Sequence, residues 1–156
     1  MRADVFSPEK RAAIMRAVKS ADTGPERTVR ASVRALGYGR RYRLNAGHLP
    51  GKPDLVFTGL GKVIFVHGCF WHGHGCKRGA RLPQHNRGYW SAKIAGNRAR
   101  DRAACKALAA QGWSTLTIWE CETRDQSALA RKLAEFLQET YASACDKEPP
   151  ARSFGD

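Results

Sequence analysis

The stretch Lys62–Cys76, KVIFVHGCFWHGHGC, joins a strand pattern to a segment rich in cysteine and histidine in this 156-residue chain. Its first six residues, 62–67, are rich in β-branched and aromatic side chains, which predicts a buried strand. The segment that follows, 68–88, is rich in Gly, His and Arg and has neither a helical nor a strand period. The sequence therefore predicts a strand that ends in an irregular loop carrying chemically reactive side chains.

The elements around this stretch predict an α/β fold. Helices alternate with apolar strands, which indicates a central mixed β-sheet flanked by helices. The expected strands are 41–45, 53–57, 62–67 and 113–119, and the expected helices begin at Gly24 and span 89–111 and 127–141. We expect one domain at 21–141, preceded by an N-terminal helix or arm at 1–20 and followed by a disordered tail at 142–156.

The charge of the chain favours a polyanionic partner. The formal net charge is +13, and residues 27–119 hold 17 of the 27 Lys and Arg residues but only two of the 14 acidic ones. Nucleic acid is the commonest partner of such a segment, although a basic surface that only aids solubility is the alternative. The sequence has neither a signal peptide nor an apolar run of about 20 residues, so we expect a cytoplasmic protein without membrane contact.

A group of thiols and imidazoles predicts a metal site. Cys69, His74 and Cys76 supply three soft or borderline ligands, and Cys121, just after the strand at 113–119, is the natural fourth. A tetrahedral structural Zn²⁺ takes such a set. The alternative is a group of buried free thiols beside loop histidines.

Asp54 is the only carboxylate between Glu26 and Asp101. A carboxylate within a segment that attracts phosphate costs binding energy unless it has a use, and holding Mg²⁺ against a phosphate is one. The alternative is an Asp that only caps a turn.

Three aromatic residues near the loop suggest stacking on nucleic acid. Phe70 and Trp71 lie between the expected metal ligands, and Trp90 opens the next helix. Aromatic rings on a basic surface stack on or between bases. The alternative is that they pack beneath the metal loop.

Four segments carry a resemblance to a known family: LPGKPDLVF, KVIFVHGCFWHGHGC, YWSAKIAGNRARDR and GWSTLTIWEC. They resemble the very short patch repair (Vsr-type) DNA mismatch endonucleases, in register from Arg11 to Glu139. The resemblance implies a restriction-endonuclease-like fold, a catalytic Mg²⁺ and a structural Zn²⁺. It also implies a monomer that nicks double-stranded DNA 5′ of the thymine in T:G mismatches, which arise by deamination of 5-methylcytosine. Mismatch-repair proteins such as MutL are the further partners it suggests.

The resemblance assigns catalytic roles to individual residues. It implies that Asp54 is the principal Mg²⁺ ligand, that His72 is the general base, and that Asp101 orients His72. The further active-site positions it implies are His67, Glu26 and the backbone carbonyl of Val66.

The resemblance also assigns the metal and DNA contacts. The structural zinc ligands it implies are Cys69, His74, Cys76 and Cys121. The residues it implies to intercalate beside the mismatch are Phe70, Trp71 and Trp90 from the major groove and Met15 from the minor groove. Gly73 and Gly75 stand where the family leads us to expect His, so we expect a more flexible loop there.

Two other functions compete with the nicking enzyme. A zinc module that only binds DNA needs no catalytic residues, so the joint presence of Asp54, His72 and Asp101 counts against it. A restriction or defence nuclease of the same fold acts on unmismatched DNA. The three aromatic residues count against that function, because a paired duplex resists unstacking by a few kcal/mol per step.

Overall fold

The computed structural model describes the chain except for residues 1–8, 11, 14–21, 45 and 139–156. The predicted tail at 142–156, Met15 and most of the predicted N-terminal arm therefore lie outside the described residues. The strands are β1 (Arg43–Leu44), β2 (Leu55–Phe57), β3 (Lys62–His67) and β4 (Ser114–Trp119). The helices are α2 (Gly24–Ala35), α3 (Arg87–Ala110) and α4 (Gln126–Gln138), with short 3₁₀ turns η1 (Thr58–Leu60) and η2 (Glu120–Arg124).

The four described strands form one mixed sheet in the order β1-β2-β3-β4. β1, β2 and β3 are successively antiparallel, whereas β3 and β4 are parallel. A parallel pair needs a long crossover connection, and here the segment 68–113 with α3 supplies it. The expectation of an α/β fold with a mixed sheet is confirmed.

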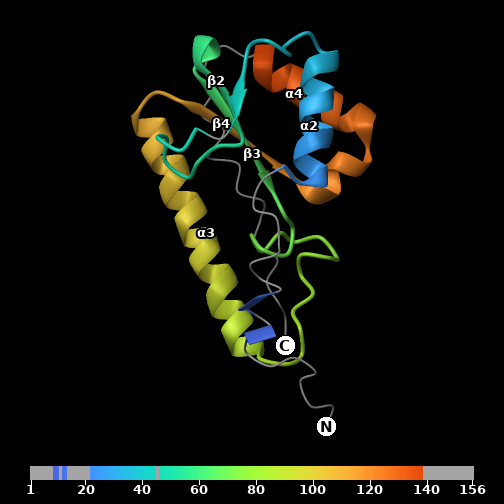
Figure 1. Cartoon of the computed structure of the whole chain (residues 1–156), viewed down its shortest axis with the longest axis vertical. Helices are drawn as coiled ribbons and strands as arrows, with labels where there is room; N and C mark the ends of the chain where they lie inside the picture. The colour runs from blue at the N-terminus through green and yellow to red at the C-terminus, as the bar shows by residue number, and fades with distance from the viewer. Residues whose placement is uncertain (1–8, 11, 14–21, 45, 139–156) are drawn as a thin grey trace.

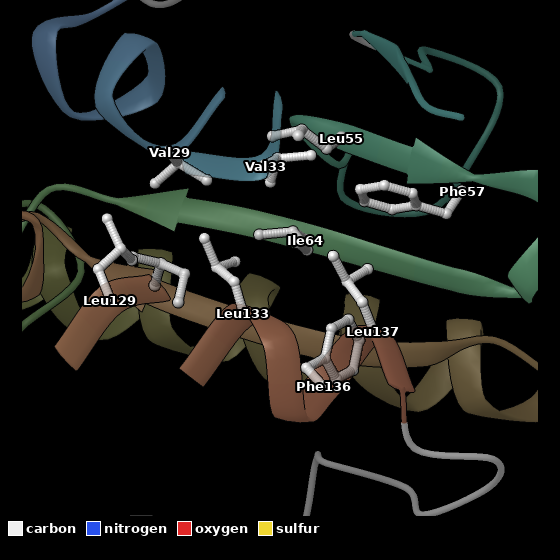
Figure 2. Packing of buried hydrophobic residues seen from close by; sticks show 10 residues of the cluster. Val29, Val33, Leu55, Phe57, Ile64, Leu129, Leu133, Phe136 and Leu137 are labelled. Carbon is white, nitrogen blue, oxygen red and sulfur yellow. The ribbon is translucent and has the colours of Figure 1, made fainter. Parts of the chain in front are cut away.

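The sheet has a core on each face because its strand residues alternate in direction. Leu55, Phe57 and Ile64 pack on one face against the helix pair α2 and α4 (Figure 2). Val56, Val63 and Phe65 pack on the other face, together with Leu108 of α3. From α4, the residues in the first core are Leu129, Leu133, Phe136 and Leu137, as the helical spacing predicts.

The helix ends follow local signals. Thr23 caps α2 with its hydroxyl, which accepts a hydrogen bond from the amide of Glu26 at 3.4 Å, and Pro25 stands in the first turn. Helix α3 begins at Arg87, two residues before the expected start. Gly112, with φ of 86°, follows its end.

Helix α3 is much longer than the sheet is wide. Its N-terminal half continues past the sheet beside the irregular segment after β3 (Figure 1). Only Ile94, Ala104 and Leu108 along its 24 residues are buried. This half of α3 is therefore placed to present side chains to the loop that follows β3.

The parallel register fixes where the functional side chains meet. His67 ends β3, Trp119 ends β4, and the two residues are register partners. Cys69 and Cys121 each lie two residues beyond the end of β3 and β4, respectively. Because the two strands are parallel, both cysteines lie at the same edge of the sheet.

Candidate functional site

A His–Asp cluster, consisting of His67, His72 and Asp101, lies at the end of β3. Nδ1 of His72 lies 2.6 Å from Oδ2 of Asp101, which projects from α3. The rings of His67 and His72 stack with centroids 3.8 Å apart and 4° between their planes. Because an ionised carboxylate only accepts hydrogen bonds, Nδ1 of His72 carries the proton and Nε2 is free to accept one.

His67 occupies the buried end of this cluster. Burial lowers its pKa to about 4, and the neighbouring His72 adds to the shift while Asp101 opposes it. At neutral pH its imidazole is therefore uncharged. A neutral ring can lie against the ring of His72 without repelling it when His72 takes up a proton.

Asp54 stands immediately before β2, beside the last residues of the neighbouring strand β3. Its amide donates to the carbonyl of Ile64, and its Oδ2 accepts a hydrogen bond from the amide of Val66 at 2.6 Å. Burial raises the pKa of Asp54 to about 6, opposed by the Val66 amide and reinforced by the nearby carboxylate of Glu26. A carboxylate that is costly to ionise in the bare protein is one that a bound cation would stabilise.

Glu26 reaches the same region from the first turn of α2. Its side chain is 6% exposed, and its Oε2 accepts the amide of Asp22 at 2.8 Å. The guanidinium of Arg30 lies 3.9 Å from the Glu26 carboxylate and also pairs with Asp22. The site therefore contains the buried carboxylate of Glu26, the half-buried carboxylate of Asp54 and the guanidinium of Arg30, which offsets part of their negative charge.

A Cys–His cluster, consisting of Cys69, His74, Cys76 and Cys121, lies beside the first. Its four ligand atoms all lie within 4.8 Å of one another. Sγ of Cys69 accepts the Cys121 amide at 3.4 Å, and Sγ of Cys121 lies 3.5 Å from Nδ1 of His74. Three thiols and one imidazole are the donors that a soft or borderline ion prefers, so these residues fit a tetrahedral metal site.

Two glycines let the loop close around the Cys–His cluster. Gly79 packs so tightly that a Cβ there would lie 2.1 Å from the carbonyl oxygen of His74, and its amide donates to Sγ of Cys76. Gly73 has φ of 65°, and a Cβ there would lie 2.7 Å from Ile94 of α3. Gly73 therefore stands where a side chain would not fit, whereas a Cβ at Gly75 would meet no atom within 4 Å. The expected greater flexibility of the loop stays a prediction.

An aromatic cluster, consisting of Phe70, Trp71 and Trp90, lies between the loop and α3. Its ring centroids are 5.1 Å, 5.6 Å and 6.0 Å apart in the three pairs. The backbone carbonyl of Trp71 accepts a hydrogen bond from Nδ2 of Asn97 at 2.7 Å. The rings remain half-buried rather than enclosed in the core, so they form part of the surface of the site.

The structure brings together most of the residues that the sequence singled out. The residues of the three clusters alternate along the segment 67–76, and α3 and η2 supply Trp90, Asp101 and Cys121. Asp54 and Glu26 come from other elements. Sequence reasoning missed Lys93, whose ammonium lies 5.8 Å from the ring of Trp71 and 6.0 Å from that of Trp90. Its i,i+3 spacing from Trp90 on α3 was the signal that could have found it. It also missed Trp119, which contacts the ring of His67 in the His–Asp cluster and the ring of His74 in the Cys–His cluster.

Known proteins similar to this chain are DNA endonucleases. A family model described as DNA mismatch endonuclease Vsr matches residues 3–78. The chain is 48% identical to the type II nicking enzyme V.XorIIP of Xanthomonas oryzae pv. oryzae over 86% of this chain and 96% of that protein. It is 37% identical to the DNA mismatch endonuclease Vsr of Escherichia coli over 91% of this chain and 92% of that protein. It is 35% identical to the type II nicking enzyme V.NmeAIP of Neisseria meningitidis over 87% and 95% of the two chains.

These matches define the class of the protein as a DNA endonuclease, a hydrolase of phosphodiester bonds. Within that class, the chain belongs to the Vsr family of DNA mismatch endonucleases, as its sequence motifs indicate. Within the described part of the chain, no helix combines the length and the apolar character needed to cross a bilayer.

Replacement of Gly79 by Ala is expected to disrupt the Cys–His cluster. The new Cβ would overlap the backbone of His74, which cannot move without displacing a ligand, so the free energy of unfolding should fall by about 2 kcal/mol or more. Gly75→Ala in the same loop is the matched control, because open space surrounds that position. Urea unfolding and the metal content of the purified variants measure the effect. Equal stability of the two variants would contradict the close packing of Gly79 against the His74 carbonyl.

The raised pKa of Asp54 predicts a pH-dependent gain in stability for Asp54→Asn when no Mg²⁺ is added. The folded state binds the Asp54 proton more tightly than the unfolded state, so ionisation at higher pH opposes folding. The gain should grow between pH 5 and pH 8 by about 1 kcal/mol. Urea melts across this range measure it, with the exposed Glu135→Gln as the control for loss of one negative charge. A gain that shrinks as the pH rises would show that burial does not disfavour the Asp54 anion.

Proposed function

We propose that this enzyme nicks one DNA strand on the 5′ side of the thymine in a T:G mismatch. The observation that carries the proposal is the pairing of His72 with Asp101 beside the half-buried carboxylate of Asp54. A relative at 37% identity bears the name DNA mismatch endonuclease, which supports a mismatch as the substrate. The mixed sheet, with Asp54 before β2, His67 at the end of β3 and His72 in the segment beyond it, is consistent with a restriction-endonuclease-like core.

The proposed reaction is hydrolysis of a phosphodiester by an activated water. Asp54 and the backbone carbonyl of Val66 would hold Mg²⁺, and Glu26 would add negative charge nearby. A bound Mg²⁺ would neutralise part of the negative charge that develops on the phosphate. The preference of Mg²⁺ for one or two carboxylates and other hard oxygen ligands fits these groups.

His72 is the proposed general base. Its Nε2 would accept a proton from the attacking water, because Asp101 holds the proton on Nδ1. Asp101 would also stabilise the imidazolium that results. His67, stacked on His72 and uncharged, would keep the ring in place.

The Cys–His cluster is the proposed site of a structural Zn²⁺. Its four ligands come from the loop after β3 and from the start of η2, so the ion would cross-link the ends of the two parallel strands. A site that uses four protein ligands leaves no position open for a substrate, which fits a structural role.

The aromatic cluster is the proposed reader of the mismatch. Its half-buried rings stand on a segment of high positive charge, where the phosphates of any duplex would be attracted. A wobble pair is easier to unstack than a Watson–Crick pair, so insertion of the rings would favour the mismatch.

A second candidate is a nicking enzyme that acts at a specific site in fully paired DNA. The names of several relatives, such as the type II nicking enzyme at 48% identity, favour this alternative. A panel of labelled duplexes that carry each mismatch or none, assayed with and without Mg²⁺, separates the two. Preferential nicking of T:G supports the proposal, and equal nicking of the paired duplex supports the alternative.

Asp54→Ala and His72→Ala are each expected to abolish nicking while binding to mismatched DNA is largely retained. Loss of a general base alone slows a reaction by about 10²–10⁴-fold. His48→Ala is the control, because His48 is an exposed loop histidine outside both clusters. Single-turnover nicking and a binding assay on the same duplex measure the two effects. Turnover near that of the wild type by either variant would refute the assigned role.

One Zn²⁺ per chain is the expected result of metal analysis, and Cys121→Ser should lose it. Because structural zinc contributes to the free energy of folding, this variant should be unstable or insoluble. Cys105→Ser is the control, since Cys105 lies on α3 outside the Cys–His cluster and should keep the metal. Well-folded wild-type protein without zinc would rule out the site.

Replacement of Phe70, Trp71 and Trp90 by Ala should abolish the preference for T:G over T:A duplexes. Stacking of a ring on a base contributes roughly 1–3 kcal/mol, and without it the cost of opening the mismatch is not recovered. The salt dependence of binding should stay nearly unchanged, because no phosphate contact is removed. Binding isotherms at several salt concentrations test both statements. If the triple variant keeps its original preference, hydrogen bonds to the mispaired bases carry recognition instead.

A further inference from the structure

Trp119 occupies the junction between the two clusters. It is the last residue of β4, the register partner of His67, and stands two residues before Cys121. Its position is therefore fixed on one side by the parallel sheet and on the other by the Cys–His cluster. The side chain is half-buried at the edge of the sheet where both clusters lie.

The indole contacts three histidine rings. It stacks on His74 with centroids 4.4 Å apart and 16° between the planes. It meets the stacked pair edge-on, with its centroid 5.5 Å from that of His67 and 6.5 Å from that of His72. One side chain therefore contacts a member of the Cys–His cluster and both imidazoles of the His–Asp cluster.

His72 lies outside regular secondary structure, so side-chain contacts add to the turn hydrogen bonds that hold it. His72 lies in the segment between β3 and α3, where a turn hydrogen bond from its amide to Gly68 is the local backbone support. Asp101 holds one edge of the imidazole, and His67 covers one face. His74, two residues further along, is held by its cluster and by an amide hydrogen bond to the Cys69 carbonyl of 2.9 Å.

We propose that Trp119 is a positioning residue for nicking. It packs between His74 of the Cys–His cluster and the stacked rings of His67 and His72, and so holds those two rings in place. This inference rests on the proposed role of His72 as the base. Removal of the indole would leave space beside all three rings and let His72 rotate away from Asp101. Misplacement of a catalytic group by about 1 Å can slow a reaction by about 100-fold.

The test compares Trp119→Leu, which removes the ring, with Trp119→Phe, which keeps one. Trp113→Leu is the matched control, because Trp113 precedes the other end of β4 and packs in the second core with Phe65 and Leu108. We expect Trp119→Leu to lower kcat by about 10–100-fold while KM stays within about twofold of the wild-type value. Trp119→Phe should retain most of the wild-type kcat. Trp113→Leu should lower the stability of the protein without changing kcat.

A second readout does not depend on activity. The proton between His72 Nδ1 and Asp101 should give a low-field ¹H NMR signal in the wild type. This signal should disappear or broaden in Trp119→Leu and persist in Trp119→Phe and Trp113→Leu. Metal content should remain at the wild-type level in all three. If Trp119→Leu does not fold, Trp119→Met against Trp119→Phe provides the same contrast.

The outcomes separate this inference from the proposed function. Wild-type kcat and an intact low-field signal in Trp119→Leu would overturn the role of Trp119 while His72→Ala remains inactive. The role of Trp119 would also be overturned if Trp119→Leu and Trp113→Leu lose kcat equally after correction for the fraction of folded protein. A general packing defect would then explain the result. An active His72→Ala variant would instead overturn the proposed role of His72 as the base.

Discussion

The parallel pairing of β3 with β4 is the constraint on which the site depends. It places His67 and Trp119 side by side and brings Cys69 and Cys121 to the same edge of the sheet. A parallel pair requires a long crossover, and the crossover here contains both the loop after β3 and the 24-residue helix α3. The connection that the topology requires is therefore also the segment that carries most of the functional side chains.

Burial shifts the pKa values of two residues at this edge of the sheet, Asp54 upward and His67 downward. Asp54 is half-buried where its negative charge is unfavourable in the bare protein, and its pKa is raised to about 6 for that reason. His67 is buried and neutral, so it packs rather than titrates at physiological pH. His72 is half-buried and paired with Asp101, an arrangement that suits the general base proposed above. The unfavourable charge of Asp54 lowers stability at neutral pH, at the position proposed to hold Mg²⁺.

The fold was largely predictable because the sequence patterns were strong and local. The run of β-branched residues at 62–67 indicates β3, and the apolar spacing of Leu129, Leu133 and Phe136 indicates the buried face of α4. Helix α3 starts two residues before the predicted position, directly after Asn86, a residue type favoured at the N-cap. Asn86 makes no side-chain cap hydrogen bond there and has φ of 58°. The terminal segments lie outside the described residues, so those expectations stay predictions.

Residue types and spacings are sufficient to predict the class of chemistry, because the grouped cysteines and histidines, the isolated Asp54 and the basic central segment are all visible in the sequence. Which of these residues touch depends on how the chain folds. The 2.6 Å contact of His72 with Asp101 joins residues 29 positions apart, and the packing of Gly79 against His74 depends on backbone atoms that no pattern reveals. The stacking of Trp119 on His74 depends on the strand register. Contacts of this kind depend on how β3, β4 and α3 pack, which local propensity does not encode.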